Sequence, residues 1–368
     1  MLSLKHEFIR HKFFIKINKL TSKYIIFLLD NKSNKQSNKQ SNKQFNKKIN
    51  VDRIIGCFIL TLYFFDIDQI DDVIIWIDDK NNKSFNTIKR NFEYFDIQIN
   101  DPSEYKITDK FINKWNKCAS KYIEKLKKIP NQMLNQMLNQ TSKYVYENNL
   151  LYLTANDKFK KINIIKPVYD KLNKLLNNYN HNLSSFDINH YIYVLCYRYI
   201  YFGIYDNNSQ LALNEQYKIK LKHKYNIDTE LFASPINSYY ENYYSLFPFM
   251  EKLFGSKGRF SNIQILESKY YFANPPFEEE IMNQVSLKYI EFMNKFNSKF
   301  IMTIPIWTKI PFNINSNKEL YKDFMAFYLI IPYIKKIKIY KKNQLKYINY
   351  TTFKSTYVSD TYFIIIGI

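Results

Sequence analysis

Apolar and polar residues along this chain repeat with two different periods. Within residues 107–126, apolar residues recur at spacings of three and four, which is typical of one face of an amphipathic helix, and Pro130 follows as a stop signal. The rest of residues 51–183 has a mainly helical pattern, although residues 71–78 fit a short strand as an alternative, because residues 73–77 are β-prone. The predicted helix face consists of Ile107, Phe111, Ile112, Trp115, Ala119, Tyr122 and Leu126.

Short apolar and aromatic runs dominate from residue 186 onward. Residues 188–203 predict a helix that packs on a sheet and ends at Gly203, because glycine readily adopts the left-handed conformation that closes a helix. Strands are predicted over residues 225–232, 271–273, 299–306, 330–340 and 361–368. This mixture of helical and strand patterns predicts an α/β domain.

Three segments follow from the pattern. Residues 1–50 form a basic N-terminal segment without the apolar core of a signal peptide, and residues 31–50 repeat the polar unit Ser-Asn-Lys-Gln, which predicts a linker. Residues 51–185 are predicted to be a helical accessory domain, followed by the α/β domain at residues 186–368. The longest apolar run, residues 54–65, is shorter than the roughly 20 residues of a membrane-spanning helix, so no membrane partner is expected.

The formal net charge of +21 adds a polyanionic partner, RNA or DNA, to this picture. Lysine dominates, since five of the 54 basic residues are arginine, and AT-rich coding is an alternative cause of the lysine excess. The cysteines, Cys57, Cys118 and Cys196, form no Cys-x-x-Cys pair, and the histidines are scattered. We therefore expect no metal, no disulfide framework and an intracellular, reducing compartment, which is the nucleus or cytoplasm, or the host cytoplasm for a viral protein.

The predicted strand at residues 271–273 stops in Asn274-Pro275-Pro276-Phe277. A proline cannot donate to a sheet ladder, and it holds the preceding residue in an extended conformation, so the strand must end here in a stiff turn. In open α/β sheets, ligands bind outside the carboxyl ends of the strands. The turn is therefore a candidate binding site, and the alternative is a rigid turn without a ligand.

This turn carries groups that suit an adenine base. Asn274 Oδ1 and the Pro275 carbonyl can accept the two N–H groups of the adenine N6 amine, which aims the nitrogen lone pair at an electrophilic methyl group. Phe277 can stack on the base, and such stacking contributes roughly 1–3 kcal/mol per base. The candidate catalytic residues are Asn274, Pro275, Pro276 and Phe277.

Four ordered blocks surround this turn. They are residues 230–240 (Glu-Leu-Phe-Ala-Ser-Pro-Ile-Asn-Ser-Tyr-Tyr), residues 254–258 (Phe-Gly-Ser-Lys-Gly), residues 273–282 around the Asn-Pro-Pro-Phe turn, and residues 304–307 (Ile-Pro-Ile-Trp). Together they resemble the catalytic half of the phosphorylated CTD-interacting factor family, over residues 186–368. The resemblance implies a Rossmann-like, S-adenosylmethionine-dependent methyltransferase domain that methylates N6 of the adenosine beside an mRNA cap.

The resemblance also implies site residues. Residues 232–237 stand where related enzymes carry a glycine-rich turn against the cofactor, and Pro235 is expected to open the next helix. The cationic loop at residues 255–259 is expected to touch a phosphate or the cofactor, or to be a surface turn. The implied cofactor-binding residues are Phe232, Ala233, Ser234, Pro235, Asn237 and Asn274. The implied substrate-binding residues are Phe277, Glu279, Trp307, Thr308, Lys309, Ile310 and Pro311, with Trp307 against the methylated guanine of the cap.

Two other functions stay open. A DNA adenine methyltransferase would use the same turn on a base flipped from a duplex, and a noncatalytic relative would keep the fold and bind RNA. The family's N-terminal WW module should show two closely spaced tryptophans, whereas Trp76, Trp115 and Trp307 lie far apart. Binding to a phosphorylated polymerase tail is therefore not expected.

Overall fold

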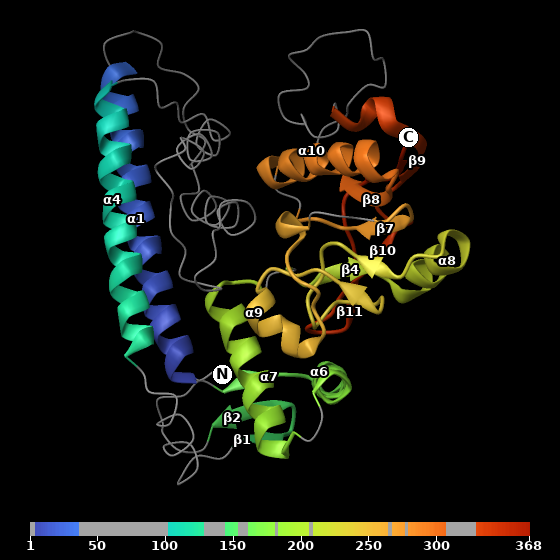
Figure 1. Cartoon of the computed structure of the whole chain (residues 1–368), viewed down its shortest axis with the longest axis horizontal. Coiled ribbons are helices and arrows are strands. Elements are labelled where there is room, and N and C mark those ends of the chain that lie inside the picture. Colours follow the sequence, from blue (N-terminus) through green and yellow to red (C-terminus); the bar gives the residue numbers. More distant parts are fainter. Residues whose placement is uncertain are drawn as a thin grey trace. The chain divides into compact units, whose positions relative to one another are not determined.

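The computed structural model describes residues 4–36, 102–128, 144–153, 161–180, 183–205, 209–263, 267–276, 279–306 and 329–368 (Figure 1). Contacts within the chain divide it into two compact units, Ser3–Met133 and Leu134–Ile368. The main boundary that the sequence pattern predicts lies later, between residues 185 and 186.

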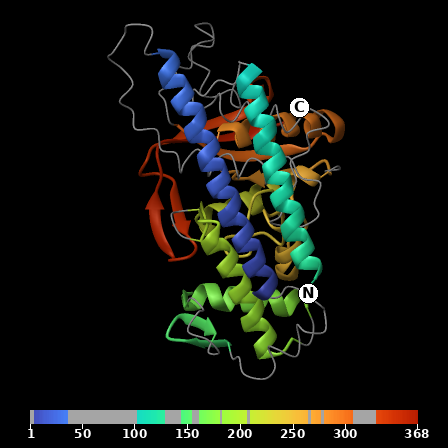
Figure 2. The same cartoon turned by 90° about the vertical axis from the view of Figure 1, so that its left-hand side faces the viewer.

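Two long helices, α1 (Leu4–Gln36) and α4 (Pro102–Lys127), make up the described part of the first unit. They pack along each other, as Figure 2 shows. Helix α1 includes residues 31–36, the first part of the tract predicted to be a linker. Lysine and glutamine are good helix formers, and lengthening an existing helix costs far less than starting one. Residues 37–50 of the tract lie outside the described residues.

Aromatic contacts join these two helices. Trp115 is fully buried and meets the ring of Phe13 edge to face, with the ring centroids 6.3 Å apart. Tyr24 stacks on Phe111 with centroids 4.4 Å apart. The amphipathic helix predicted over residues 107–126 is confirmed, and the middle of its predicted face is buried.

The second unit begins with a small antiparallel sheet of β1 (Tyr144–Glu147), β2 (Leu150–Leu153) and β3 (Ile162–Asn163). Strands β1 and β2 form a hairpin whose turn residues, Asn148 and Asn149, have φ of 49° and 62°. Asparagine tolerates this left-handed conformation, which matches the twist of a two-residue hairpin. The mainly helical pattern predicted for residues 51–183 therefore does not hold here, because strands this short show no clear period.

Two helices follow, α6 (Lys166–Tyr179) and α7 (Ser185–Tyr201). Helix α7 starts in a capping box, in which the side chains of Ser184 and Asp187 each accept from the other's backbone N–H. It ends at Tyr201 with Phe202 as its C-cap, and Gly203 follows with φ of +70°. The helix predicted over residues 188–203 and its end at Gly203 are confirmed.

The main sheet has six strands in the order β6-β5-β7-β8-β12-β9. Strands β6, β5, β7 and β8 are parallel, whereas β12 is antiparallel to both β8 and β9. The architecture is thus mixed α/β, as predicted at that level. The strands are β5 (Thr229–Glu230), β6 (Asn242–Tyr243), β7 (Tyr270–Ala273), β8 (Lys299–Pro305), β9 (Ile334–Tyr340) and β12 (Thr361–Ile366).

Four of the five predicted strands are confirmed, as β7, β8, β9 and β12. The prediction of a strand over residues 225–232 is wrong for most of these residues, because β5 spans Thr229–Glu230. Helix α8 (Glu215–Tyr225) occupies its start, and Asn226 closes that helix in a left-handed conformation with φ of 52°. Between β6 and β7 the chain forms α9 (Pro248–Glu251), η1 (Lys252–Phe254) and η2 (Phe260–Asn262), and η4 (Ile331–Tyr333) precedes β9.

Each face of the main sheet packs against other elements. Helix α10 (Glu279–Phe296) covers one face, where Tyr289 stacks on Phe300 of β8 with centroids 4.3 Å apart. On the other face, Phe272 and Ile301 join residues of α8 and of a second sheet in one buried cluster. That second sheet has the order β11-β10-β4, with β4 (Leu211–Leu213), β10 (Lys346–Asn349) and β11 (Lys354–Tyr357).

Among the residues that the structure describes, no helix combines the length and the apolar character needed to cross a bilayer. The apolar run at residues 54–65 lies outside them.

Replacing Trp115 by alanine is expected to destabilise the α1–α4 pair by roughly 3–5 kcal/mol, the usual cost of removing a buried tryptophan. Urea unfolding followed by circular dichroism measures this loss as a lower midpoint. Lys114→Ala, at an exposed position of the same helix, is the matched control and should shift the midpoint little. Equal midpoints for the two variants would contradict the buried contact between Trp115 and Phe13.

Candidate functional site

The carboxyl ends of the neighbouring strands β5 and β7 lie side by side, at the point in the main sheet where the strand order reverses. From β5 the chain continues to β6 on one side, and from β7 it continues to β8 on the other. Ligands of open α/β sheets bind at such a switch point. The loop after β5 and the turn after β7 both start there, since Leu231 N donates to the Phe272 carbonyl at 2.9 Å.

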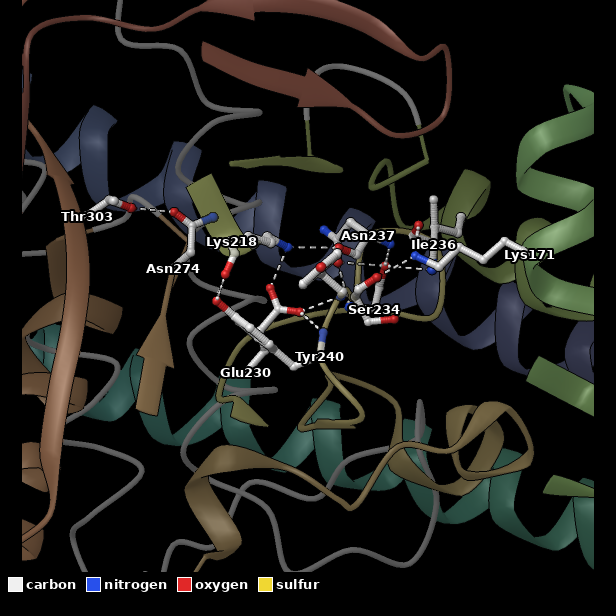
Figure 3. Close-up of polar contacts among 11 residues, drawn as sticks. Lys171, Lys218, Glu230, Ser234, Ile236, Asn237, Tyr240, Asn274 and Thr303 are labelled. Carbon is white, nitrogen blue, oxygen red and sulfur yellow. Dashed lines mark hydrogen bonds and ion pairs between the residues drawn. The ribbon is translucent and has the colours of Figure 1, made fainter. Parts of the chain in front are cut away.

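The turn after β7 holds Asn274 in a defined position. Asn274 is part-buried, and its Oδ1 accepts a hydrogen bond from Thr303 Oγ1 of β8 at 2.6 Å (Figure 3). Pro275 is buried and Pro276 is part-exposed. Strand β7 ends at Ala273, so the predicted strand end before two prolines is confirmed. The catalytic role of the turn stays a prediction.

Ser234 and Asn237 organise the loop after β5. Ser234 N donates to Asn237 Oδ1 at 2.7 Å, and Ile236 N donates to Ser234 Oγ at 3.2 Å. Ser234 Oγ in turn donates to Gln210 Oε1 at 2.6 Å. These side chains satisfy backbone groups locally and favour a turn. Over residues 231–243 the chain passes from this turn to β6, and the helix predicted to open at Pro235 does not form.

The residues predicted to bind the cofactor fall into two groups. Ser234 and Pro235 are buried, so they support the loop from beneath. The ring of Phe232 packs on Phe260, with centroids 4.7 Å apart. The part-exposed members, which can offer atoms to a ligand, are Phe232, Ala233, Asn237 and Asn274.

A buried carboxylate closes the end of β5. Glu230 is 2% exposed, and its Oε1 pairs with Nζ of the equally buried Lys218 of α8 at 2.6 Å. Glu230 Oε2 accepts from the backbone N–H groups of Tyr239 and Tyr240 at 2.6 and 3.4 Å. Burying a charge is costly unless it is both paired and hydrogen-bonded, and Glu230 meets both conditions.

Two lysines bind consecutive carbonyl groups of this loop (Figure 3). Lys171 Nζ of α6 donates to the carbonyl oxygens of Ile236 and Ser238 at 2.7 and 2.6 Å. Lys218 Nζ donates to the Asn237 carbonyl between them at 3.3 Å. Helices α6 and α8 therefore fix the path of the loop, although both precede it in the sequence.

The loop at residues 255–259 exposes one of its two cationic residues. Lys257 is exposed, whereas Arg259 is 2% exposed. Arg259 donates through Nε and Nη2 to the Leu246 carbonyl at 3.1 and 2.7 Å. Arg259 thus supports the segment after β6, which favours the surface-turn interpretation of this loop.

Sequence reasoning singled out none of Lys171, Lys218, Glu230 and Thr303. Two of them carry a signal in the sequence that indicates a site residue: Glu230 is an acid within a β-prone run, and Thr303 is a hydroxyl residue within another. The two lysines carry no such signal, because they share their helices with exposed lysines such as Lys174.

Most of the predicted substrate-binding residues lie outside the described residues. Glu279 is the first residue of α10, and its backbone alone is described. Those outside are Phe277, Trp307, Thr308, Lys309, Ile310 and Pro311.

Stability should depend on pH through Lys171. Burial, together with the charge of Lys218, lowers the pKa of Lys171 from 10.5 to about 7. Below about pH 7 this lysine is charged whether the chain is folded or unfolded, so the cost of burying the charge applies in full. As pH rises from about 7 to 10.5, the unfolded chain keeps the proton that the folded chain has lost, so the contribution of Lys171 to stability increases.

We therefore expect wild type to gain stability relative to Lys171→Met as pH rises through this range, measured as urea midpoints. Lys174→Met, at an exposed position of the same helix, should differ from wild type in urea midpoint by the same amount at every pH. A difference between wild type and Lys171→Met that does not change with pH would refute the assignment.

Comparison with known proteins finds a matching family model and similar proteins. The family model described as "Phosphorylated CTD interacting factor 1 WW domain" matches residues 165–332. An mRNA (2'-O-methyladenosine-N(6)-)-methyltransferase of Homo sapiens is 32% identical over 110 residues, which are 29% of this chain and 15% of that protein. The protein of the same name from Mus musculus is 34% identical over 89 residues, which are 24% of this chain and 12% of that protein. The matches therefore span a small part of these relatives.

The matched region includes α6, the loop after β5 and the turn after β7. Although the description of the family model mentions a WW domain, residues 165–332 contain Trp307 as their single tryptophan, whereas a WW module has two. The match therefore concerns the unit that carries the main sheet. The resemblance inferred from the four sequence blocks is confirmed: residues 165–332 match the model of the phosphorylated CTD interacting factor 1 family, and the chain is similar to the human and mouse methyltransferases.

Proposed function

We propose that this chain transfers a methyl group from S-adenosylmethionine to the N6 amine of adenosine in RNA, at the nucleotide beside an mRNA cap. The observation that carries the proposal is the position of residues 274–276 at the carboxyl end of β7, beside the switch point between β5 and β7. The names of the human and mouse relatives support mRNA as the substrate and N6 as the methylated atom.

The finer fold in this proposal is a Rossmann-like methyltransferase domain that is preceded in the sequence by a helical accessory domain. It is supported by four parallel strands with a switch point between β5 and β7, and by helices α8 and α10 on opposite faces of the sheet. The α1–α4 pair supports the helical accessory domain.

The loop after β5 suits S-adenosylmethionine, which supplies an electrophilic methyl group when bound. The small side chain of Ala233 lets the backbone approach a ligand closely. Part-exposed Phe232 offers an aromatic face, and part-exposed Asn237 offers an amide nitrogen that can donate, since its Oδ1 already accepts from Ser234 N. The buried Ser234 and Pro235 keep these groups in place from beneath.

Asn274 and Pro275 position the reacting amine in this proposal. The adenine N6 amine is a weak nucleophile, because its lone pair is delocalised into the ring. Asn274 Oδ1 and the Pro275 carbonyl accept both N–H groups, which favours a tetrahedral nitrogen with its lone pair toward the methyl group. In the proposal, Phe277 stacks on the base and holds it in the plane of these two acceptors.

The RNA part of the proposal is supported by the net charge of +21, since lysines bind phosphates without regard to sequence. The cap part rests on the family resemblance, in which Glu279 and Trp307 contact the capped nucleotide. An intracellular, reducing compartment is proposed with it.

The decisive experiment incubates the protein with methyl-labelled S-adenosylmethionine and one of three substrates: capped RNA beginning with adenosine, the same RNA without a cap, or duplex DNA that contains adenine. We expect label in capped RNA, recovered as an N6-methylated adenosine by mass spectrometry of nucleosides. Label in DNA alone would support the DNA alternative. Binding of S-adenosylhomocysteine or RNA without any transfer would support the noncatalytic one. Equal labelling with and without a cap would remove the cap from the proposal.

Variants of the turn test the mechanism. Asn274→Ala removes the acceptor and should lower turnover at least about a hundredfold, while most of the S-adenosylhomocysteine affinity is kept because the loop after β5 supplies the other predicted cofactor contacts. Asn274→Asp should keep measurable activity because a carboxylate also accepts. Phe277→Ala should lower turnover about ten- to a hundredfold, and Phe277→Tyr should lower it little. Near-normal turnover by Asn274→Ala with an unchanged melting temperature would end this mechanism.

A further inference from the structure

Strand β8 places a hydroxyl group beside the predicted catalytic amide. The register of β7 and β8 pairs Ala273 with Met302, so the next residues, Asn274 and Thr303, are neighbours on the same face of the sheet. Thr303 is fully buried, and its Oγ1 donates to Asn274 Oδ1 at 2.6 Å. Asn274 and Thr303 face each other across the two strands (Figure 3).

An asparagine side chain has two ends of opposite chemistry. Its oxygen accepts hydrogen bonds and its nitrogen donates them, so a rotation by about 180° exchanges an acceptor for a donor. If Asn274 turned its nitrogen toward the adenine, that N–H would compete for the N6 lone pair that must reach the methyl group. The proposed reaction therefore needs a residue that fixes which end of the amide faces the base.

Thr303 is suited to this task because a hydroxyl group has one hydrogen. When that hydrogen is donated to Asn274 Oδ1, one of the two oxygen lone pairs is used and the other stays available for N6–H. A hydroxyl can also accept, so a further donor to Thr303 would keep its hydrogen directed at Asn274.

Tyr347 of β10 is the candidate for this donor. It is fully buried, and its hydroxyl has no hydrogen-bond partner of good geometry. Tyr347 belongs to one buried cluster with Phe272 and Ile301, which precede Asn274 and Thr303 by two positions and therefore lie on their face of the sheet.

We propose that Thr303 is a positioning residue that orients the Asn274 amide with its oxygen toward the adenine N6 amine. This inference rests on the proposed function. Thr303 acts through Asn274, whose Oδ1 accepts its hydrogen bond.

Thr303→Val tests the inference, because valine keeps the shape of threonine and removes the hydroxyl. Turnover of capped RNA should fall by about ten- to a hundredfold, since a misdirected amide loses the alignment of the reacting groups. S-adenosylhomocysteine affinity should stay within about twofold of wild type. Thr303→Ser restores the hydroxyl and should recover most of the turnover.

Thr361→Val is the matched control. Thr361 is a buried threonine of the adjacent strand β12, and its Oγ1 donates to the Ser359 carbonyl at 2.9 Å. Its replacement removes a buried hydroxyl from the same sheet and should leave turnover unchanged. A fall of turnover equal to that of Thr303→Val would show a general loss of packing.

A binding measurement separates orientation of the amide from stability. Capped RNA that begins with purine riboside lacks the N6 amine, so wild type should bind it more weakly than RNA beginning with adenosine. Thr303→Val should lose most of this discrimination, whereas a merely structural residue would leave the ratio intact. Turnover and discrimination that both match wild type would overturn the inference alone, whereas absence of methyl transfer by wild type would overturn the proposed function and the inference with it.

Discussion

The carboxylate of Glu230 is buried beneath the site, and this constraint shapes the surrounding structure. Such a charge must be paired and hydrogen-bonded, which draws Lys218 into the interior and turns the backbone of Tyr239 and Tyr240 toward the end of β5. Tyr240 also donates through its hydroxyl to the Lys218 carbonyl at 2.9 Å. The loop, helix α8 and the sheet are thereby joined through one ionised group.

The elements of the sheet are readable in the sequence where a local signal is strong. The prolines after Asn274 mark the end of β7, and continuous apolar runs mark β8 and β12. Weaker signals fail in physical ways. Strands β1 and β2 are too short to show a period of two, so the Asn148-Asn149 turn is the stronger signal for their hairpin. Pro235 can open a helix, but the hydrogen bonds of the Ser234 and Asn237 side chains stabilise a turn there instead.

The contacts within the candidate site could not be predicted in the same way, because their partners are distant in sequence. Lys171 reaches carbonyl groups at residues 236 and 238, and Thr303 reaches Asn274 from the next strand. Such pairs are fixed by register and packing, which no window of the sequence contains. The excess of lysine hides them further, since a buried lysine has the same local sequence environment as an exposed one.

The hydrogen bonds of Lys171 decide how small a working fragment of this protein can be. A fragment cut at the apparent start of the α/β pattern, near residue 186, would lack α6 and leave the carbonyl groups of Ile236 and Ser238 without their ammonium partner. The loop beside the candidate cofactor site would then lose one of its two anchors while every strand of the main sheet remained. A fragment intended for binding or activity studies therefore has to start before Lys166, where α6 begins, close to residue 165 where the family match also begins.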